Sequence, residues 1–433
     1  MSDIKSIAKL AKEASYKLAS ISTDVKNSAL ETIAMKLEEN TSLIFEANAK
    51  DLQEAKQLVE KGEITAATYA RLKLDENKLR DMIQGIRDVK NLPDPVNRKL
   101  WAMKLDDGLD LYKVSCPIGV IGVIFEARPD VIAQISALAI KSSNAVILKG
   151  GKGSINTNIT IFELIVEALA QVDEFPTNAI NQIFNREDVA RMLEMDEYID
   201  LIIPRGGNSL VKYIKANTKI AVLGHADGIC HIYVDKMADW EKSIPIIIDA
   251  KTQYPSACNA VETVLIHKSI AAEYLPVLMS ELKKAGVKVR GCGQVCLAYP
   301  DVIPAQCDWS YEHSDLVIAI KIVENALEAI HHINTYGSGH TDCIITEDKN
   351  VADTFMDLVD SAGVYCNAST RFADGFRYGF GAEVGISTNK THARGPVGLE
   401  GLTIYKYKLF GNGQIVGDYV KGIKTFKHEQ IEC

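Results

Sequence analysis

A cysteine in a turn of small residues is the first feature of this sequence that could do covalent chemistry. Cys258 lies in the segment 254–260 (YPSACNA), between a predicted helix and a predicted strand. Backbone N–H groups and the amide of Asn259 stand beside the thiol, and such groups can share an oxyanion site. The residues alone leave two interpretations open: a nucleophile, or one small buried thiol among nine cysteines.

Two glycine-rich turns could hold an anionic cofactor. The segment 149–154 (KGGKGS) follows a predicted strand and precedes a predicted helix, where close backbone approach and a helix N-terminus favour phosphate. It matches neither the P-loop nor the G-x-G-x-x-G fingerprint. Its lysines, Lys149 and Lys152, would suit the extra 2′-phosphate of NADP. A second turn, 205–209 (RGGNS), follows another strand, and together the two turns indicate a ligand crevice rather than plain strand-to-helix turns.

Further charged residues stand in glycine-rich loops near the C-terminus. Arg371, Glu383 and His392 are interpreted as ligand contacts, with solvated loop residues as the alternative. His225 could pair with a thiol or have a structural role. No Cys or His cluster has metal-ligand spacing, so no metal is expected.

Composition restricts the class of protein. The chain has 433 residues with 57 acidic and 48 basic side chains, a net charge of −9. Such a surface offers no general attraction to nucleic acid or anionic membrane. The stretch 1–18 lacks the apolar core of a signal peptide, and no apolar run is long enough to span a membrane, so neither a leader nor a membrane span is expected. A cytoplasmic protein with reduced thiols is expected.

The hydrophobic pattern predicts helices first and two α/β regions afterwards. Residues 1–92 have helical periodicity, with Thr23 capping one helix and Asp75 beginning another. Residues 100–114 predict a β-hairpin with Asp107-Gly108 at its tip. Short apolar strands then alternate with helices, which is typical of parallel doubly wound sheets. A domain change is expected near 225–235.

These segments together resemble the glutamate-5-semialdehyde dehydrogenases, or gamma-glutamyl phosphate reductases, a divergent branch of the aldehyde dehydrogenase superfamily. The match is collinear over nearly the whole chain, and the block around Cys258 is the most specific part. The matching segments are 116–122, 126–129, 145–151, 204–209, 223–230, 251–263, 333–342 and 367–401.

The resemblance implies an aldehyde dehydrogenase-like α/β fold with two doubly wound domains and an oligomerisation region. The implied limits are 1–228 for an NADP-binding domain, with 100–125 contributing an oligomerisation hairpin, and 229–360 for a catalytic domain with Cys258. The segment 361–433 is expected to return to the cofactor domain and to end in an oligomerisation strand. A homo-oligomer is therefore expected, and a transient contact with glutamate 5-kinase is a further expectation.

The resemblance also implies residue roles. Cys258 stands at the catalytic cysteine position, with Asn259 beside it. Lys149 matches a lysine that contacts the adenosine ribose, and Lys152 stands where NAD-preferring relatives carry glutamate. The turn of Arg205, Gly206 and Gly207 matches a cofactor-side turn, and Glu312 matches a glutamate that holds the nicotinamide ribose. The candidates for holding the substrate are Arg128, Arg371, Glu383 and His392.

Two departures from aldehyde-oxidising relatives refine the expected reaction. Their general-base glutamate falls on Val222 here, and their oxyanion asparagine falls on Ala127. Release of an acyl group by water needs a base, whereas phosphate leaves an acyl phosphate without one. The expected activity is NADPH-dependent reduction of L-glutamyl 5-phosphate to glutamate 5-semialdehyde through a Cys258 thioester, the second step of proline biosynthesis from glutamate. The alternatives are an aldehyde dehydrogenase for another aldehyde and an inactive nucleotide-binding oligomer.

Overall fold

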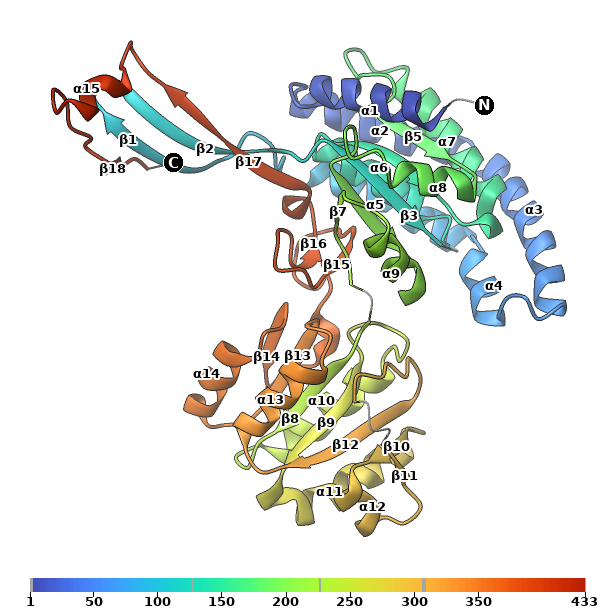
Figure 1. Ribbon diagram of the computed structural model, residues 1–433. Coiled ribbons are helices and arrows are strands. Elements are labelled where there is room, and N and C mark those ends of the chain that lie inside the picture. Colours follow the sequence, from blue (N-terminus) through green and yellow to red (C-terminus); the bar gives the residue numbers. More distant parts are fainter. Residues whose placement is uncertain (1–2, 127, 226, 306–308, 433) are drawn as a thin grey trace. The chain divides into compact units, whose positions relative to one another are not determined.

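The computed structural model divides the chain into two compact units (Figure 1). It describes residues 3–126, 128–225, 227–305 and 309–432. The first unit holds residues 1–206, 213–223 and 398–433, and the second holds 207–212 and 224–397. The chain thus leaves the first unit near residue 223 and returns to it at 398. Ala127, which stands where aldehyde-oxidising relatives are expected to carry their oxyanion asparagine, lies outside the described residues.

The first unit begins with helices, as their apolar periodicity predicts. Ser22 rather than Thr23 caps the second helix, because its hydroxyl accepts the N–H of Val25. Asp75 caps the fifth helix by accepting the N–H of Lys78. The helices of this N-terminal region are α1 (Ile4–Leu18), α2 (Thr23–Glu39), α3 (Thr41–Glu60), α4 (Ala66–Leu72) and α5 (Glu76–Asn91).

A parallel five-stranded sheet forms the centre of the first unit, in the order β5-β4-β3-β6-β7. Its strands are β3 (Val120–Phe125), β4 (Ala145–Lys149), β5 (Ile180–Ile183), β6 (Leu201–Arg205) and β7 (Ala221–Val222). Its helices and turns are α6 (Val131–Lys141), η1 (Lys152–Ser154), α7 (Ile155–Leu169), α8 (Arg186–Met192) and α9 (Asn208–Ala216). β3 is buried along its whole length, as expected for a strand covered on both faces. The predicted doubly wound α/β region is confirmed.

An antiparallel four-stranded sheet, in the order β17-β2-β1-β18, completes the first unit. Asp106 pairs with Leu109, so Asp107 and Gly108 make the predicted two-residue turn, with Gly108 at φ 69°. The elements of this region are β1 (Lys99–Asp106), β2 (Leu109–Pro117), η3 (Glu400–Leu402), β17 (Thr403–Phe410), α15 (Val416–Val420) and β18 (Glu429–Gln430). The C-terminal strand β17 pairs with β2 along its full length.

The second unit contains a parallel seven-stranded sheet in the order β11-β10-β12-β9-β8-β13-β14. Its strands are β8 (Cys230–Val234), β9 (Val261–His267), β10 (Lys288–Gly291), β11 (Ile303–Pro304), β12 (Val317–Val323), β13 (Thr341–Ile345) and β14 (Gly363–Cys366). Its helices are α10 (Trp240–Thr252), α11 (Lys268–Lys284), α12 (Gly293–Ala298), α13 (Ala326–Tyr336), α14 (Lys349–Leu358) and the short η2 (Thr370–Phe372). A two-stranded ribbon joins β15 (Gly385–Ser387) to β16 (Gly395–Val397).

Alternate residues of the central strands fall into two separate cores. Val264 packs with α10 and α11, whereas the next residue, Leu265, packs with α13 and α14. The same alternation separates Ile232 from Tyr233. Since successive side chains of a strand point to opposite faces, helices cover this sheet on both sides. No helix in the described part of the chain has the length and apolar character that crossing a membrane requires.

Candidate active site

A buried ion pair joins the two ends of the loop that carries Cys258. Lys251 in the last turn of α10 lies 3.0 Å from Glu262 in β9, and both side chains are fully buried. Glu262 also accepts the backbone N–H groups of His313 and Ser314. This carboxylate therefore joins the Cys258 loop to the segment that carries Glu312.

Replacing Lys251 with methionine is expected to destabilise the protein by about 3–5 kcal/mol, because Glu262 stays buried without its cation. Burial already raises the pKa of Glu262 to about 7, against the opposing effect of Lys251. Losing Lys251 removes that opposition and raises the folded pKa of Glu262 further, so the stability loss relative to the wild type should grow as pH rises above about 7, where Glu262 ionises in the folded wild type but not in the variant. Urea unfolding measures this. The matched control is Lys268→Met in an exposed pair with Glu324, expected to cost under about 1 kcal/mol; equal losses would contradict the prediction.

The candidate residues of the second unit meet at the amino edge of its sheet. Cys258 precedes β9, His340 precedes β13, and Gly228 precedes β8. Glu312 precedes β12. These four strands are parallel and adjacent, in the order β12-β9-β8-β13, so their amino ends lie along one edge.

His340, which the sequence did not single out, lies next to the thiol. Its Nε2 is 3.2 Å from Cys258 Sγ, and its Nδ1 is 2.9 Å from Thr341 Oγ1. The ring is fully buried, and burial lowers the pKa of His340 well below its ordinary value, with smaller effects from His225 and Arg371. The imidazole is therefore neutral. In the tautomer whose Nδ1–H donates to Thr341 Oγ1, Nε2 has its lone pair toward the sulfur and can accept the thiol proton.

The Cys258 thiol is protonated in the resting site. Burial, and then the negative charges of Glu312 and Glu383, raises the pKa of Cys258 to about 12, against a smaller opposing effect of Arg371. A free thiol has a pKa near 8.5. Cys258 therefore needs a base before it can attack, and His340 is in position to be that base.

Gly228 allows the Cys258 backbone to approach closely. A methyl group at Gly228 would lie 2.7 Å from the carbonyl carbon of Cys258 and closer still to its Cα. The Gly228 N–H donates to Glu312 Oε2 at 3.0 Å. Only glycine permits this approach, so the β8 loop fixes Glu312 near the cysteine loop.

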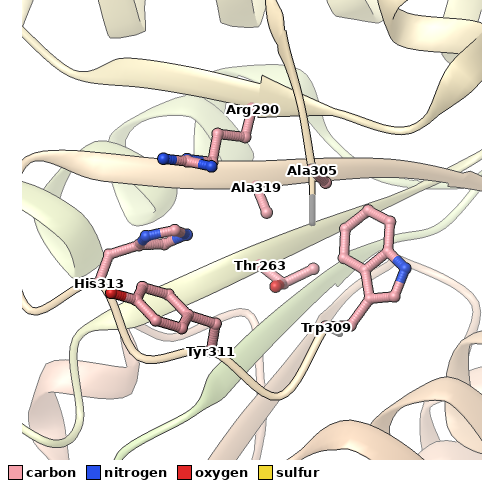
Figure 2. A pocket seen from close by; sticks show the side chains of 7 residues that line it. All are labelled: Thr263, Arg290, Ala305, Trp309, Tyr311, His313 and Ala319. Carbon is pink, nitrogen blue, oxygen red and sulfur yellow. The ribbon is translucent and has the colours of Figure 1, made fainter. Parts of the chain in front are cut away.

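Glu312 is oriented by the packing of its two neighbours. Tyr311 and His313 line a hollow of about 10 Å³, together with Trp309 and residues of β9, β10 and β12 (Figure 2). Space of this size suits about one water molecule and is too small for a substrate. Because successive side chains of an extended segment point to opposite sides, Glu312 faces away from the hollow and toward Gly228.

Asn259 anchors the cysteine loop. Its side chain is buried, and Nδ2 donates to the backbone oxygen of Ala373 at 2.8 Å. Its Oδ1 is buried without a hydrogen-bond partner among the described residues. The amide thus connects Cys258 to the segment that carries Arg371.

The predicted substrate residues are only partly brought together. Arg371 is buried, donates from Nε to Gln253 Oε1 at 2.8 Å, and lies over the Tyr254 ring, so it contacts the cysteine loop directly. Glu383 accepts the N–H of Gly375, and its charge acts on Cys258.

The other two predicted substrate residues are both exposed. His392 is exposed on the loop between β15 and β16. Arg128 belongs to the first unit, where it is exposed and pairs with Asp130 at 2.7 Å.

The first unit gathers basic groups at the carboxyl edge of its five-stranded sheet. Lys149 ends β4 and Arg205 ends β6, on either side of β3. The strand order reverses at β3, the position where open α/β sheets bind ligands. Lys152 is exposed in η1, and Gly206 and Gly207 follow β6 as exposed residues. The lysine and arginine side chains at this edge have the charge that the phosphates of a dinucleotide require.

Two N–H groups in the first turn of α7, those of Asn156 and Thr157, are already occupied, which the sequence interpretation did not anticipate. Asp51 in α3 accepts the backbone N–H groups of Asn156 and Thr157 and the Thr157 hydroxyl. This carboxylate already satisfies the helix N-terminus. An anionic cofactor at this edge would therefore be held by the basic side chains, Lys149 and Arg205, instead.

Comparison with known proteins first defines the class. A family model described as "Aldehyde dehydrogenase family" matches residues 1–290. The chain therefore belongs to the aldehyde dehydrogenase family, which confirms the fold class predicted from the sequence.

The most similar relatives define the branch of that family. A gamma-glutamyl phosphate reductase of Brachyspira hyodysenteriae is 60% identical over 428 residues, covering 98% of this chain and 99% of the relative. One from Acetivibrio thermocellus is 52% identical, covering 99% and 98%. The crystal structure of the Thermotoga maritima enzyme matches with a TM-score of 0.92 and 43% identity, covering 96% of this chain and all of that one. The branch is that of the gamma-glutamyl phosphate reductases, as the sequence predicted, and membership implies a nicotinamide cofactor.

Proposed function

We propose that this chain reduces L-glutamyl 5-phosphate to L-glutamate 5-semialdehyde and phosphate, with NADPH, in the second step of proline biosynthesis from glutamate. The name of its relatives supports the substrate. The observation that carries the chemistry is the Cys258–His340 pair, 3.2 Å apart at the amino edge of the sheet. A half-buried thiol beside a neutral imidazole is a nucleophile with its base.

The first half of the proposed reaction forms a thioester. Cys258 Sγ attacks the γ-carbonyl carbon while its proton passes to Nε2 of His340. The bond from carbon to the phosphate oxygen breaks, and phosphate leaves with the bonding electrons. We propose that the Cys258 backbone N–H stabilises the charge on the carbonyl oxygen, together with the Asn259 amide, whose Nδ2 also donates to the Ala373 carbonyl. The lack of a base at Val222 does not hinder thioester formation, because this half of the reaction does not use water.

The second half discharges the thioester. When bound, a reduced nicotinamide cofactor would supply hydride to the thioester carbonyl, which would give the alkoxide of a thiohemiacetal. The carbon–sulfur bond then breaks, the aldehyde is released, and the proton on His340 returns to the Cys258 sulfur. The net reaction takes up one proton from solvent. The protonated resting thiol is therefore restored at the end of each cycle.

We propose that six residues identified in the sequence bind the cofactor. Lys149, Lys152 and Arg205 offer positive charge, and Gly206 and Gly207 allow close approach to the turn. Glu312 would hold the nicotinamide ribose. Its carboxylate is fixed by the Gly228 N–H near the Cys258 loop, which supports the assignment.

Replacing Lys152 with glutamate is expected to raise the KM for NADPH about 10–100-fold and to lower the KM for NADH. A charge-assisted contact to the 2′-phosphate contributes about 1.5–3 kcal/mol, and the carboxylate would repel the phosphate and accept a ribose hydroxyl. Steady-state kinetics with both cofactors measure this. Lys9→Glu makes the same charge change on exposed α1 and should leave both constants unchanged. An unaltered NADPH-to-NADH ratio in Lys152→Glu would refute the assignment.

We propose that Arg371 binds the phosphate or the carboxylate of the substrate and that Glu383 binds the amino group of the substrate. Both charges act on Cys258, which supports the assignment. Arg128 and His392 remain proposed contacts on the strength of the family resemblance alone.

The antiparallel sheet supports the proposal of a homo-oligomer. β17 is a C-terminal strand with apolar side chains exposed along its length, and monomers rarely expose a contiguous set of this kind. The exposed residues of this strand are Ile404, Tyr405, Tyr407, Leu409 and Phe410. A transient contact with glutamate 5-kinase is also proposed, since that enzyme makes the acyl phosphate. A cytoplasmic location is proposed because the seven described cysteines are free.

One assay tests the function against its alternatives. Purified protein is mixed with glutamate 5-semialdehyde, phosphate and NADP⁺, and the absorbance of the reduced cofactor is followed. Reduction that depends on phosphate supports the proposal. Reduction without phosphate would indicate an aldehyde dehydrogenase, and no reduction would indicate an inactive nucleotide-binding oligomer.

A further inference from the structure

Three potential metal ligands converge at the nucleophile from distant parts of the chain. Cys258, His225 and His340 each offer one ligand atom, and these atoms lie within 4.8 Å of one another. Thiolate sulfur and imidazole nitrogen are the donors that Zn²⁺ prefers. We propose that these three residues form a binding site for Zn²⁺, whose binding blocks the nucleophile reversibly.

The distances are compatible with zinc coordination. Bonds of about 2.3 Å to sulfur and about 2.0 Å to nitrogen place the ligand atoms of a tetrahedral site about 3.3–3.6 Å apart. Cys258 Sγ and His340 Nε2 are already 3.2 Å apart. The third ligand atom belongs to His225, and a side-chain shift of about 1 Å brings it into the same range.

Both histidines are held by hydrogen bonds of the kind that orient metal ligands. A metal-bound imidazole usually donates its other N–H to a carbonyl, carboxylate or hydroxyl oxygen. His225 Nδ1 lies 2.9 Å from the backbone oxygen of Ile386, and His340 Nδ1 lies 2.9 Å from Thr341 Oγ1. The Ile386 carbonyl can only accept, so the Nδ1 of His225 carries the proton and its Nε2 the lone pair. The Thr341 hydroxyl is compatible with the same tautomer in His340. The two rings meet edge to face with centroids 4.9 Å apart.

The charges around the three ligands favour a cation. Glu312 and Glu383 both act on the Cys258 sulfur, and Arg371 is the cation that opposes them. Three protein ligands leave a fourth coordination position open, unlike the closed set of a structural zinc site. The ion can therefore exchange. Binding breaks the S–H bond of Cys258 and releases its proton to solvent as the sulfur–zinc bond forms. While the ion is bound, the thiolate lone pair is engaged and cannot attack an acyl phosphate.

Metal binding is tested first without any enzymatic reaction. Co²⁺ is titrated into the purified, metal-stripped protein as a spectroscopic probe, and the expected result is a thiolate-to-cobalt charge-transfer band that Zn²⁺ abolishes. The band should be absent in Cys258→Ser and at least about 10-fold weaker in apparent affinity in His225→Ala. His331→Ala removes an exposed imidazole outside the cluster and should leave the titration unchanged. A missing band in the wild type, or an unchanged affinity in His225→Ala, would overturn the inference.

Inhibition is tested separately and rests on the proposed function. Zn²⁺ should inhibit the reductase competitively with the acyl phosphate, and a chelator should restore the rate. In His225→Ala the inhibition constant, measured against that variant's own uninhibited rate, should rise at least about 10-fold. Equal inhibition of both proteins would overturn the blocking role. Absence of any reductase activity would count against the proposed function and leave the cobalt titration to decide the site.

Discussion

Replacing Cys258 with serine is expected to reduce kcat by at least about 10³-fold, because removing a catalytic nucleophile leaves only binding and oxyanion stabilisation. Serine keeps the size and the hydrogen bond to His340 but is a far poorer nucleophile toward the acyl phosphate. Steady-state kinetics measure the rate. NADPH binding, followed by fluorescence titration, should be unchanged, because the expected cofactor residues lie at other positions.

Cys296→Ser is the matched control for that variant, because it makes the same change at another half-buried thiol. It should have the kinetics of the wild type. Near-normal turnover in Cys258→Ser would remove Cys258 from the mechanism. Loss of NADPH binding in the same variant would instead indicate that the substitution disturbs the whole unit.

Replacing His340 with alanine is expected to reduce kcat/KM by about 10²–10⁴-fold, the usual contribution of a positioned general base. The reason is the resting state of the thiol. With the pKa of Cys258 near 12 and the imidazole neutral, His340 is the group in contact with the sulfur that can take its proton. The loss should appear with little change in NADPH binding.

The pH profile separates a base from a merely structural histidine. In the wild type, the rate near neutral pH should depend only weakly on hydroxide, because His340 accepts the thiol proton. In His340→Ala the rate should instead rise with pH over the whole range in which the protein is folded, since only hydroxide can now ionise Cys258. His331→Ala should reproduce the wild-type profile. A uniformly lowered but parallel profile in His340→Ala would indicate a structural role.

Much of the architecture could be predicted from the sequence because it depends on local periodicity. The alternation of short apolar strands with helices predicts parallel sheets, and Asp107-Gly108 between alternating residues predicts the hairpin. The predicted N-cap of α2, Thr23, was wrong by one residue. Serine and threonine are both good caps, and only the folded backbone selects Ser22. The helix α4 is only seven residues long and was not predicted.

The phosphate interpretation of α7 could not be tested by sequence alone. The pattern of glycine and lysine before a helix is the same whether the first-turn N–H groups are open or already satisfied. Asp51 lies far away along the chain, and its approach to Asn156 and Thr157 depends on how α3 packs against α7. The spacing of residues in the sequence therefore does not predict this contact.

The sequence by itself determined the nucleophile candidate, the two α/β regions and the branch of the family, because these depend on contiguous segments such as the one around Cys258. The tertiary structure decided which groups surround that thiol. His225 and His340 come from loops before β8 and β13, and they meet Cys258 only because those strands and β9 are neighbours in one parallel sheet. Burial at that edge then keeps the thiol protonated and the imidazole neutral, a property of the folded environment that no residue pattern encodes.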